Sequence, residues 1–363
     1  MTLAFGCSVA GLLLFFPANF LPFLSTSVLQ AKRTSVIASC VSAMTNDGWP
    51  TLAAVIGFVV IVAPFARFTL LSAVLGSVLY NRRRPWLGRA FRYATWFEVW
   101  AMTDVLLVAL WVAYERLDAT VSTTLGAGGV CFVVVGFISL ILTAALDKAT
   151  VWRAIMPDSE HVEPPAVACM VCSRVEQTRL LGSDCPRCSA RLRLRRPQSV
   201  SRATALVIAS VILYIPANIL PMATLPIKFS QVSYTVMGGV IDLIEVRMIG
   251  LALLVFVASF AIPFLKLASL GWCISSVVRR SRRRLRLKTK LYHVVDAIGR
   301  WSMVDPLVLA CFVPVTQYNA AMSSRAEAAA PAFTAVVLLT VIAARVFDPR
   351  LMWDVARERG DDG

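Results

Sequence analysis

The sequence contains few of the side chains that carry out catalysis in soluble enzymes. Two histidines occur among its 363 residues, and each of them, His161 and His293, stands alone. There is no Walker loop, no Ser-His-Asp arrangement and no glycine fingerprint for a dinucleotide. We therefore expect that this chain is not an enzyme and has no catalytic residues.

Charged residues are also scarce. They make up 16% of the chain, whereas hydrophobic residues make up 58%, and a soluble domain usually carries about 25% charged residues. Several apolar runs reach the roughly 20 residues that a membrane-spanning helix needs. No positive side chain precedes the first apolar run, so we do not expect a cleaved signal peptide. The composition predicts an all-α integral membrane protein that crosses the bilayer several times.

One short phrase occurs twice. Residues 15–24 read FFPANFLPFL, and residues 214–223 read YIPANILPMA, 199 positions later. The same spacing relates Pro64 to Pro263 and Arg67 to Lys266, and a spacing of 201 relates the two copies of Trp-x-Met-x-Asp that end at Asp104 and Asp305. Proline and tryptophan are common in membrane helices, but that does not explain a shared spacing. The pattern indicates an internal repeat.

Each half of the repeat has four apolar runs of spanning length. In the first half we expect spans at 3–24, 51–79, 97–114 and 124–146. In the second half we expect them at 203–222, 248–277, 302–321 and 330–347. Residues 1–157 and 201–363 would then form two four-helix transmembrane repeats, joined by a linker at 158–200. With an even number of spans in each half, the two repeats are parallel.

The net charge of +15 is concentrated in short basic runs. Residues 81–97 contain five arginines and no acid, residues 279–290 contain eight basic residues, and residues 187–202 contain six arginines. All three runs fall on one side of an eight-span topology, and basic loops are cytoplasmic. Most of these arginines need only anchor the chain at anionic headgroups, so we expect no nucleic-acid partner.

Four of the nine cysteines have an informative spacing. The two Cys-x-x-Cys pairs, CMVC and CPRC, are separated by 12 residues, and they contain Cys169, Cys172, Cys185 and Cys188. Two such pairs bring four thiolates around one tetrahedral ion, most often zinc. Two disulfides, a dithiol redox pair and a mononuclear iron site are the alternatives, and a cytoplasmic linker disfavours disulfides. We expect one structural zinc ion per chain.

The repeated phrase predicts a local break in two helices. Proline cannot donate to the preceding turn, and a nearby asparagine amide can donate to the carbonyl groups that it frees. We expect a broken or kinked helix end in both halves, where the membrane part opens to the periplasm. A kink that only helps packing is the alternative. The residues of this helix-break motif are Pro17, Asn19, Pro22, Pro216, Asn218 and Pro221.

Charges inside apolar runs are a further candidate site. Lys266 lies near the middle of a run, where a lysine costs about 2.5–3.5 kcal/mol on insertion scales. The repeat gives each half one base and one acid: Arg67 with Asp104, and Lys266 with Asp305. We expect an acid–base pair in each half that belongs to a polar transport network, with a purely structural pair as the alternative.

Taken together, these motifs resemble the paraquat-inducible protein A family. The resemblance rests on CPRC, the basic run before YIPANILPM, and then PFLK, WSMVD and FDPRLMWD. It implies a multi-pass protein of the bacterial inner membrane with a cytoplasmic zinc ribbon. It also implies membrane lipids and a periplasmic MCE-domain tunnel protein as partners. Members often carry a cysteine ribbon before each half, whereas this sequence reaches its first apolar run almost at once.

Three functions are consistent with this reading. The resemblance favours a subunit of an intermembrane lipid transport system, which loads or moves lipid for the MCE protein. A membrane redox protein that cycles its CxxC thiols in oxidative stress is the second possibility. A membrane scaffold that transports nothing itself is the third. Tightly held metal would separate the first from the second.

Overall fold

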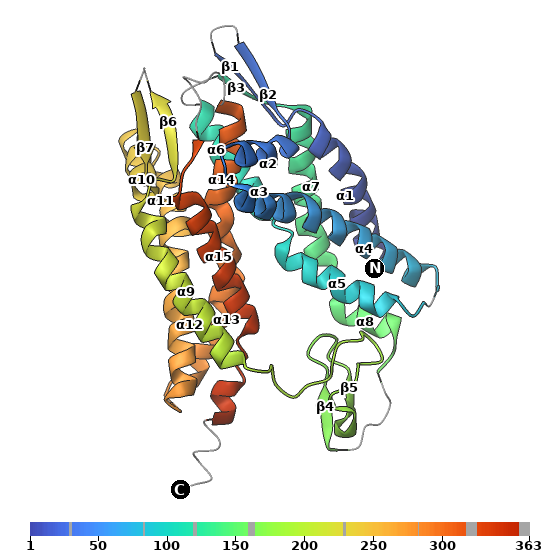
Figure 1. Ribbon diagram of the computed structural model, residues 1–363. Helices are drawn as coiled ribbons and strands as arrows, with labels where there is room; N and C mark the ends of the chain where they lie inside the picture. Colours follow the sequence, from blue (N-terminus) through green and yellow to red (C-terminus); the bar gives the residue numbers. More distant parts are fainter. Residues whose placement is uncertain are drawn as a thin grey trace.

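The computed structural model describes residues 1–28, 31–82, 84–118, 122–158, 164–227, 230–281, 283–316 and 325–355. Two helical bodies stand side by side, with a small β-containing unit at one end and two short sheets at the other (Figure 1). Among the described residues, eight helical segments are long and apolar enough to cross a membrane. The predicted fold, an all-α membrane protein with eight spans, is confirmed.

The first half begins with a spanning helix, which a β-hairpin and a short helix follow. A long helix comes next, then a broken third span and a final span. Its elements are α1 Thr2–Phe20, β1 Leu24–Val28, β2 Ala31–Ser35, α2 Ile37–Asn46, α3 Pro50–Gly57, η1 Phe58–Val62, α4 Ala63–Leu79, α5 Leu87–Trp100, α6 Thr103–Asp118, β3 Ser122–Leu125, α7 Ala127–Ala145 and α8 Lys148–Ile155.

The second half repeats this order. Its elements are α9 Ser199–Ile219, β6 Ala223–Ile227, β7 Ser230–Tyr234, α10 Val236–Glu245, α11 Ile249–Phe256, η3 Val257–Ala261, α12 Ile262–Val278, α13 Leu285–Ile298, η4 Gly299–Met303, α14 Val304–Thr316, β8 Arg325–Ala326 and α15 Ala329–Val346. The two halves are therefore parallel repeats. Between them lies the ribbon, residues 164–198, which contains β4 Ala166–Ala168, β5 Val175–Gln177 and the 3₁₀ turn η2 Thr178–Leu180.

Each half carries a three-stranded antiparallel sheet that the sequence analysis missed. The strand order is β2-β1-β3 in the first half and β7-β6-β8 in the second. Leu24 pairs with both Ser35 and Leu125, and Ala223 pairs with both Tyr234 and Ala326. In both halves the hairpin follows the repeated proline phrase, and the third strand precedes the last span. Both sheets lie at the end of the molecule opposite the ribbon (Figure 1).

The third span of each half is longer than the sequence predicted. The expected spans at 97–114 and 302–321 are observed at Leu87–Glu115 and Leu285–Pro314, and residues 317–321 lie outside the described part of the chain. Both spans are interrupted. In the first half, two non-helical residues separate α5 from α6, and in the second half the 3₁₀ segment η4 lies between α13 and α14. The first part of each span was not predicted, because α5 and α13 carry several basic side chains and their composition resembles that of a loop.

The long second helix of each half contains one widened turn. The π-helical segments η1 and η3 end two residues before Pro64 and Pro263. The amide of Ala63 reaches back five residues to the carbonyl of Phe58, and Ile262 reaches Val257 in the same way. Proline has no backbone amide to donate. In each repeat, the hydrogen bond that reaches back five residues therefore lies next to a residue that cannot donate one. Such π-turns are frequent at functional sites.

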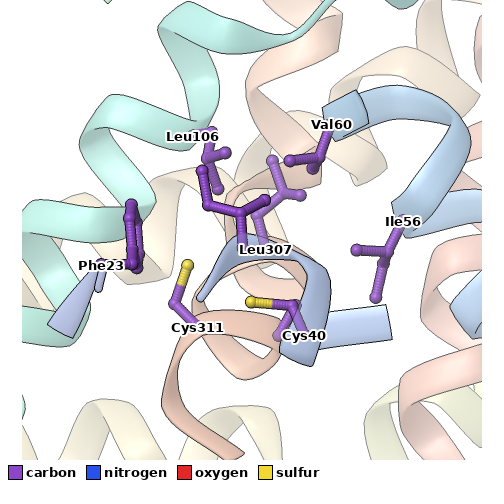
Figure 2. Close-up of a pocket in the computed structure, with 9 residues that line it drawn as sticks. Phe23, Cys40, Ile56, Val60, Leu106, Leu307 and Cys311 are labelled. Carbon is purple, nitrogen blue, oxygen red and sulfur yellow. The ribbon is translucent and has the colours of Figure 1, made fainter. Parts of the chain in front are cut away.

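The two halves meet mainly through α14, which packs against α6 and α2 of the first half. A small apolar cavity of about 10 Å³ lies in this interface. Cys40 and Cys311, from opposite halves, both point into it (Figure 2). The space is about that of one water molecule and is far too small for a lipid chain. The cavity is therefore a packing defect between the halves and not a lipid site.

Candidate functional site

The four spaced cysteines form one buried cluster in the ribbon. Their sulfur atoms all lie within 4.8 Å of one another. The Sγ atoms of Cys169 and Cys188 are 3.6 Å apart, as are those of Cys172 and Cys185. A tetrahedral zinc–sulfur site with bonds of about 2.3 Å has sulfur–sulfur edges of roughly 3.8 Å. The residues present therefore fit a four-thiolate metal ion, and all four thiols are free.

The two cysteine pairs have the same local backbone. In the first, the amide of Ser173 donates to the carbonyl of Cys169, and in the second Ser189 donates to Cys185. Both serines have positive φ, 59° and 53°, which turns the chain sharply after each pair. Hydrogen bonds from the neighbouring thiols of Cys172, Cys185 and Cys188 lower the pKa of the Cys169 thiol. Hydrogen bonds within the same cluster raise the pKa of the Cys172 and Cys188 thiols, so the cluster holds both thiolates, the form that binds metal, and the thiols that donate to them.

The ribbon is docked on the first half at α5. A Cβ atom added to Gly88 would lie only 1.7 Å from the backbone oxygen of Arg187, so this close approach requires glycine. The guanidinium of Arg92 donates to the carbonyl of Ser189 at 2.6 Å. On the ribbon side, the buried guanidinium of Arg187 donates to Asp158 at 2.7 Å and holds the pKa of that carboxyl below its ordinary value. The second cysteine pair is thus fixed against a membrane helix.

The chain that leaves the ribbon is tied to the second half. Arg195 makes a two-pronged ion pair with Asp354, at 2.6 and 2.8 Å. Arg196 donates to the carbonyl of Arg345, and the Ser199 hydroxyl donates to that of Val346 at 3.0 Å. These contacts hold the segment after the ribbon against the end of α15. The ribbon therefore connects the two membrane halves through fixed contacts on both sides.

The repeated proline phrase forms the C-terminal end of α1 and of α9. Each helix continues through its first proline, Pro17 or Pro216, and ends three residues later, before the second proline. The Asn19 amide donates to the carbonyl of Phe15 at 2.7 Å, and Asn218 donates to Tyr214 at 2.8 Å. These acceptors lie one turn before the asparagines themselves, and the break or kink expected at the prolines stays a prediction.

The second proline of each phrase docks the next span. The carbonyl of Pro22 accepts from the amide of Gly128 in α7, and that of Pro221 accepts from Ala329 in α15. The phrase therefore joins the end of the first span of each half to the start of the fourth. Whether it also moves during function stays a prediction.

Arg67 is buried in the first half, with 3% of its surface exposed. Its guanidinium donates to the hydroxyls of Ser139 and Thr143 on α7, at 3.3 and 2.9 Å. The Ser139 hydroxyl also accepts from Thr103 at 3.0 Å. Thr103 is next to Asp104 at the start of α6, so these hydroxyls connect the buried arginine to the carboxylate-bearing turn.

Asp104 forms an ion pair with the opposite half. Its carboxylate lies 3.2 Å from a guanidinium nitrogen of Arg300, in η4. The preceding residue, Gly299, accepts a hydrogen bond of 3.2 Å from Lys266 through its carbonyl. A Cβ atom on Gly299 would lie 2.6 Å from Cε of Lys266, so a larger residue here would displace the flexible end of the lysine. Polar contacts, joined through the backbone at Thr103–Asp104 and at Gly299–Arg300, thus link Arg67 in the first half to Lys266 in the second.

The observed contacts differ from the expected pairing within each half. Among the described residues, the ion pair of Asp104 is with Arg300 and not with Arg67. Lys266, which is 1% exposed, contacts a backbone carbonyl instead of Asp305, while Asp305 lies half-buried in the first turn of α14. Among the described residues, the two buried cations donate to hydroxyl and carbonyl oxygens instead of carboxylates, and Nε of Arg67 is left without a partner.

The sequence analysis missed Arg300 and Gly299. Arg300 stands directly before the second copy of Trp-x-Met-x-Asp, where the first copy has Val99. Because the candidate charges were chosen by comparing the two repeats, Arg300, which has no charged counterpart in the first repeat, was not selected. The position of Arg300, one residue from a repeated motif and inside an apolar stretch, was the available signal.

Comparison with known proteins gives consistent matches along the chain. The family model described as "Paraquat-inducible protein A" matches residues 2–156 and 200–357. The chain is 28% identical to "Intermembrane transport protein PqiA" of Escherichia coli strain K12, over 96% of this chain and 85% of that protein. It is also 28% identical to "Lipophilic envelope-spanning tunnel protein A" of the same strain, over 94% of this chain and 79% of that protein.

A "Probable intermembrane transport protein" of Haemophilus influenzae is 24% identical, over 94% of this chain and 83% of that protein. No solved structure matches the chain.

Proposed function

Because the chain belongs to the paraquat-inducible protein A family, we propose that it is the inner-membrane subunit of an intermembrane lipid transport system. The names of its relatives, intermembrane transport protein and lipophilic envelope-spanning tunnel protein, support this proposal. In this system the chain loads or moves membrane lipid for a periplasmic MCE-domain tunnel protein. It does so without catalysis.

The observation that supports a transport role is the series of polar contacts that starts at the buried Arg67 and Lys266 and crosses between the halves at the partly exposed Arg300. Charges inside membrane spans are costly, and they commonly mark transport pathways. Here they lie on four elements, α4, α6, η4 and α12, and they cross the interface between the two repeats. In transporters built from repeats, substrate sites form at such interfaces. We propose that Arg67, Asp104, Arg300 and Lys266 belong to a network that rearranges during transport.

The sidedness follows from charge. The ribbon and the basic first turns of α5 and α13 lie at one end of the molecule, and both sheets lie at the other (Figure 1). Since basic loops face the cytoplasm, we place the ribbon in the cytoplasm and the sheets in the periplasm. In this orientation the proline phrases reach the periplasmic surface.

The ribbon has a structural role in this proposal. Four protein thiolates complete a tetrahedral zinc ion and leave no position for a reactive water. The close packing of the four buried sulfurs supports a closed metal site over freely cycling thiols. Elemental analysis of the purified protein tests this point: about one zinc ion per chain, with thiols unreactive until a chelator is added, is the expected result. Reactive thiols without metal would favour the redox function instead.

Copurification tests the assembly. The chain is expressed with the MCE-domain protein encoded beside it, the complex is isolated from membranes, and bound lipids are identified by mass spectrometry. A stable complex that carries lipid is the expected result. A chain that associates with neither the MCE protein nor lipid would contradict the proposal.

Variants of the second half test the transport role. Lys266→Ala and Arg300→Ala should abolish complementation of a deletion strain under envelope stress, while the protein stays inserted, abundant and bound to its partner. The reason is that each substitution removes one charge from the transport pathway. Full complementation by both well-expressed variants would show that these charges are not required.

A further inference from the structure

The two repeats share a backbone at the short helix after each hairpin. The helices α2 and α10 have the same length, and their bounds differ by the 199 positions that separate the repeats. The turns that follow have the same hydrogen bonds: Trp49 donates to the carbonyl of Met44, and Met248 donates to that of Leu243. Any difference between their surfaces therefore comes from side chains.

The outer faces of these two helices differ in chemistry. The exposed positions of α2 carry small or polar side chains, namely Ala38, Ser42, Thr45 and Asn46. The first three of these positions correspond to large apolar residues on α10: Met237, Ile241 and Ile244. Ile241 is 50% exposed and Ile244 is 53% exposed. One repeat has therefore placed an apolar face where the other keeps a polar one.

The turn after each helix, at residues 47–49 and 246–248, differs in the same way, because its first residue is polar in the first half and apolar in the second. In the first half this turn contacts protein, because the Asp47 carboxylate accepts from the amide of Ala326 at 3.0 Å and Trp49 Nε1 donates to the carbonyl of Ala326 at 3.0 Å. In the second half the residue equivalent to Asp47 is Val246, which is exposed and offers no polar side-chain atom. Figure 1 shows α10 on the outer side of the second half, away from the first half.

The apolar face of α10 continues into the surface of a membrane span. Ile249 and Leu253, in α11, are more than half exposed and belong to the span Ile249–Val278. Exposed isoleucine and leucine on a spanning helix face lipid. The positions equivalent to these two in the first half are Pro50 and Ala54, so the lipid-facing surface of the second half is larger at this end.

We propose that α10 is an interfacial helix that lies in the lipid bilayer with its Met237, Ile241 and Ile244 face among the acyl chains, whereas α2 does not contact lipid. An amphipathic helix binds a bilayer in this way when its apolar face is continuous and its other face can meet headgroups. The exposed charges of Glu245 and Arg247 at the end of α10 suit the headgroup level. The second repeat is then the lipid-contacting side of the molecule at the end that carries the sheets.

This inference does not depend on transport, and photo-crosslinking tests it directly. The photoreactive residue p-benzoylphenylalanine replaces Ile241 in one variant and Ser42, its counterpart in the first half, in another. Each purified full-length protein is placed in vesicles of phosphatidylethanolamine and phosphatidylglycerol and irradiated, and adducts are identified by mass spectrometry. We expect a phospholipid adduct at position 241 and none above the unirradiated background at position 42.

A second matched pair, p-benzoylphenylalanine in place of Ile244 and of Thr45, guards against a variant that fails to insert. Lipid adducts at both members of a pair, or at neither, would overturn the proposal. A crosslink from position 241 or 244 to a second copy of the chain would also overturn it, because the face would then be a protein interface. The same variants can be assayed for complementation, so that loss of transport and loss of lipid contact are measured separately.

Discussion

The contact between the ribbon and the first membrane half depends on one glycine. In Gly88→Ala, the new Cβ atom would lie 1.7 Å from the carbonyl oxygen of Arg187, and real Cβ atoms essentially never approach a neighbour within 3.0 Å. The obstacle is a backbone atom, so no side chain can turn aside. The second cysteine pair must withdraw from α5 by roughly 1.3 Å or more.

The cost of this movement can be worked out from the contacts that it breaks. The hydrogen bond from Arg92 to Ser189, now 2.6 Å, would lengthen beyond hydrogen-bond range, and a bond from a charged donor contributes about 1.5–3 kcal/mol. Overpacking at a tight contact adds about 1–3 kcal/mol. We expect Gly88→Ala to weaken the docking of the ribbon by about 4 kcal/mol.

Three measurements check this prediction: thermal unfolding in detergent, limited proteolysis mapped to residues 158–198, and zinc content. We expect faster cleavage and a lower unfolding temperature, with zinc retained, because the four cysteines are untouched. Gly271→Ala is the matched control, since no atom lies within 4 Å of a Cβ added there. If Gly88→Ala unfolds and is cleaved like this control, the ribbon is not held on α5 in the way described.

Three further predictions concern the metal centre and the polar chain. Cys185→Ser should release the metal and lower the amount of folded protein, because a structural zinc ion supplies folding free energy; unchanged zinc content and abundance would exclude the site. Asp104→Arg should impair complementation, and adding Arg300→Asp should restore it in part, whereas a double variant no better than the single one would rule out a functional ion pair. Gly299→Ala should displace the Lys266 ammonium and reduce transport without changing zinc content, and full complementation would show that this contact is dispensable.

Much of the architecture could be predicted from the sequence, because the length of apolar runs, the spacing of the cysteines and the order of the repeat markers each have a direct structural consequence. Eight apolar runs were enough to predict the number of spans, because hydrocarbon thickness fixes the length of a spanning helix. The cysteine spacing predicted the cluster of four sulfurs for a similarly direct reason: two turns of one geometry can place four ligands around one ion. The repeat predicted two parallel halves, since its markers keep their order and spacing.

The missed features depend on contacts that a periodic pattern does not encode. The strands β1 and β6 are only five residues long, and β1 reads LSTSV, too short and too polar to stand out beside apolar helices. The first part of each third span was missed because arginine and lysine on α5 and α13 resemble loop composition. The partner of Asp104 was missed because Arg300 exists in one repeat only.

The polar chain also explains how a change in one half can reach the other. Gly299 and Arg300 are adjacent in the short 3₁₀ segment η4. The carbonyl of Gly299 is held by Lys266 of its own half, and the side chain of Arg300 is held by Asp104 of the other half. A shift of α12 that moves Lys266 must move this turn or break its hydrogen bond, and a moved turn displaces the guanidinium from Asp104. From there Thr103 and Ser139 lead to Arg67. Coupling through packed elements requires such a contiguous path with alternative arrangements. If the halves move during transport as proposed, η4 is the segment through which these contacts would transmit that movement from one half to the other.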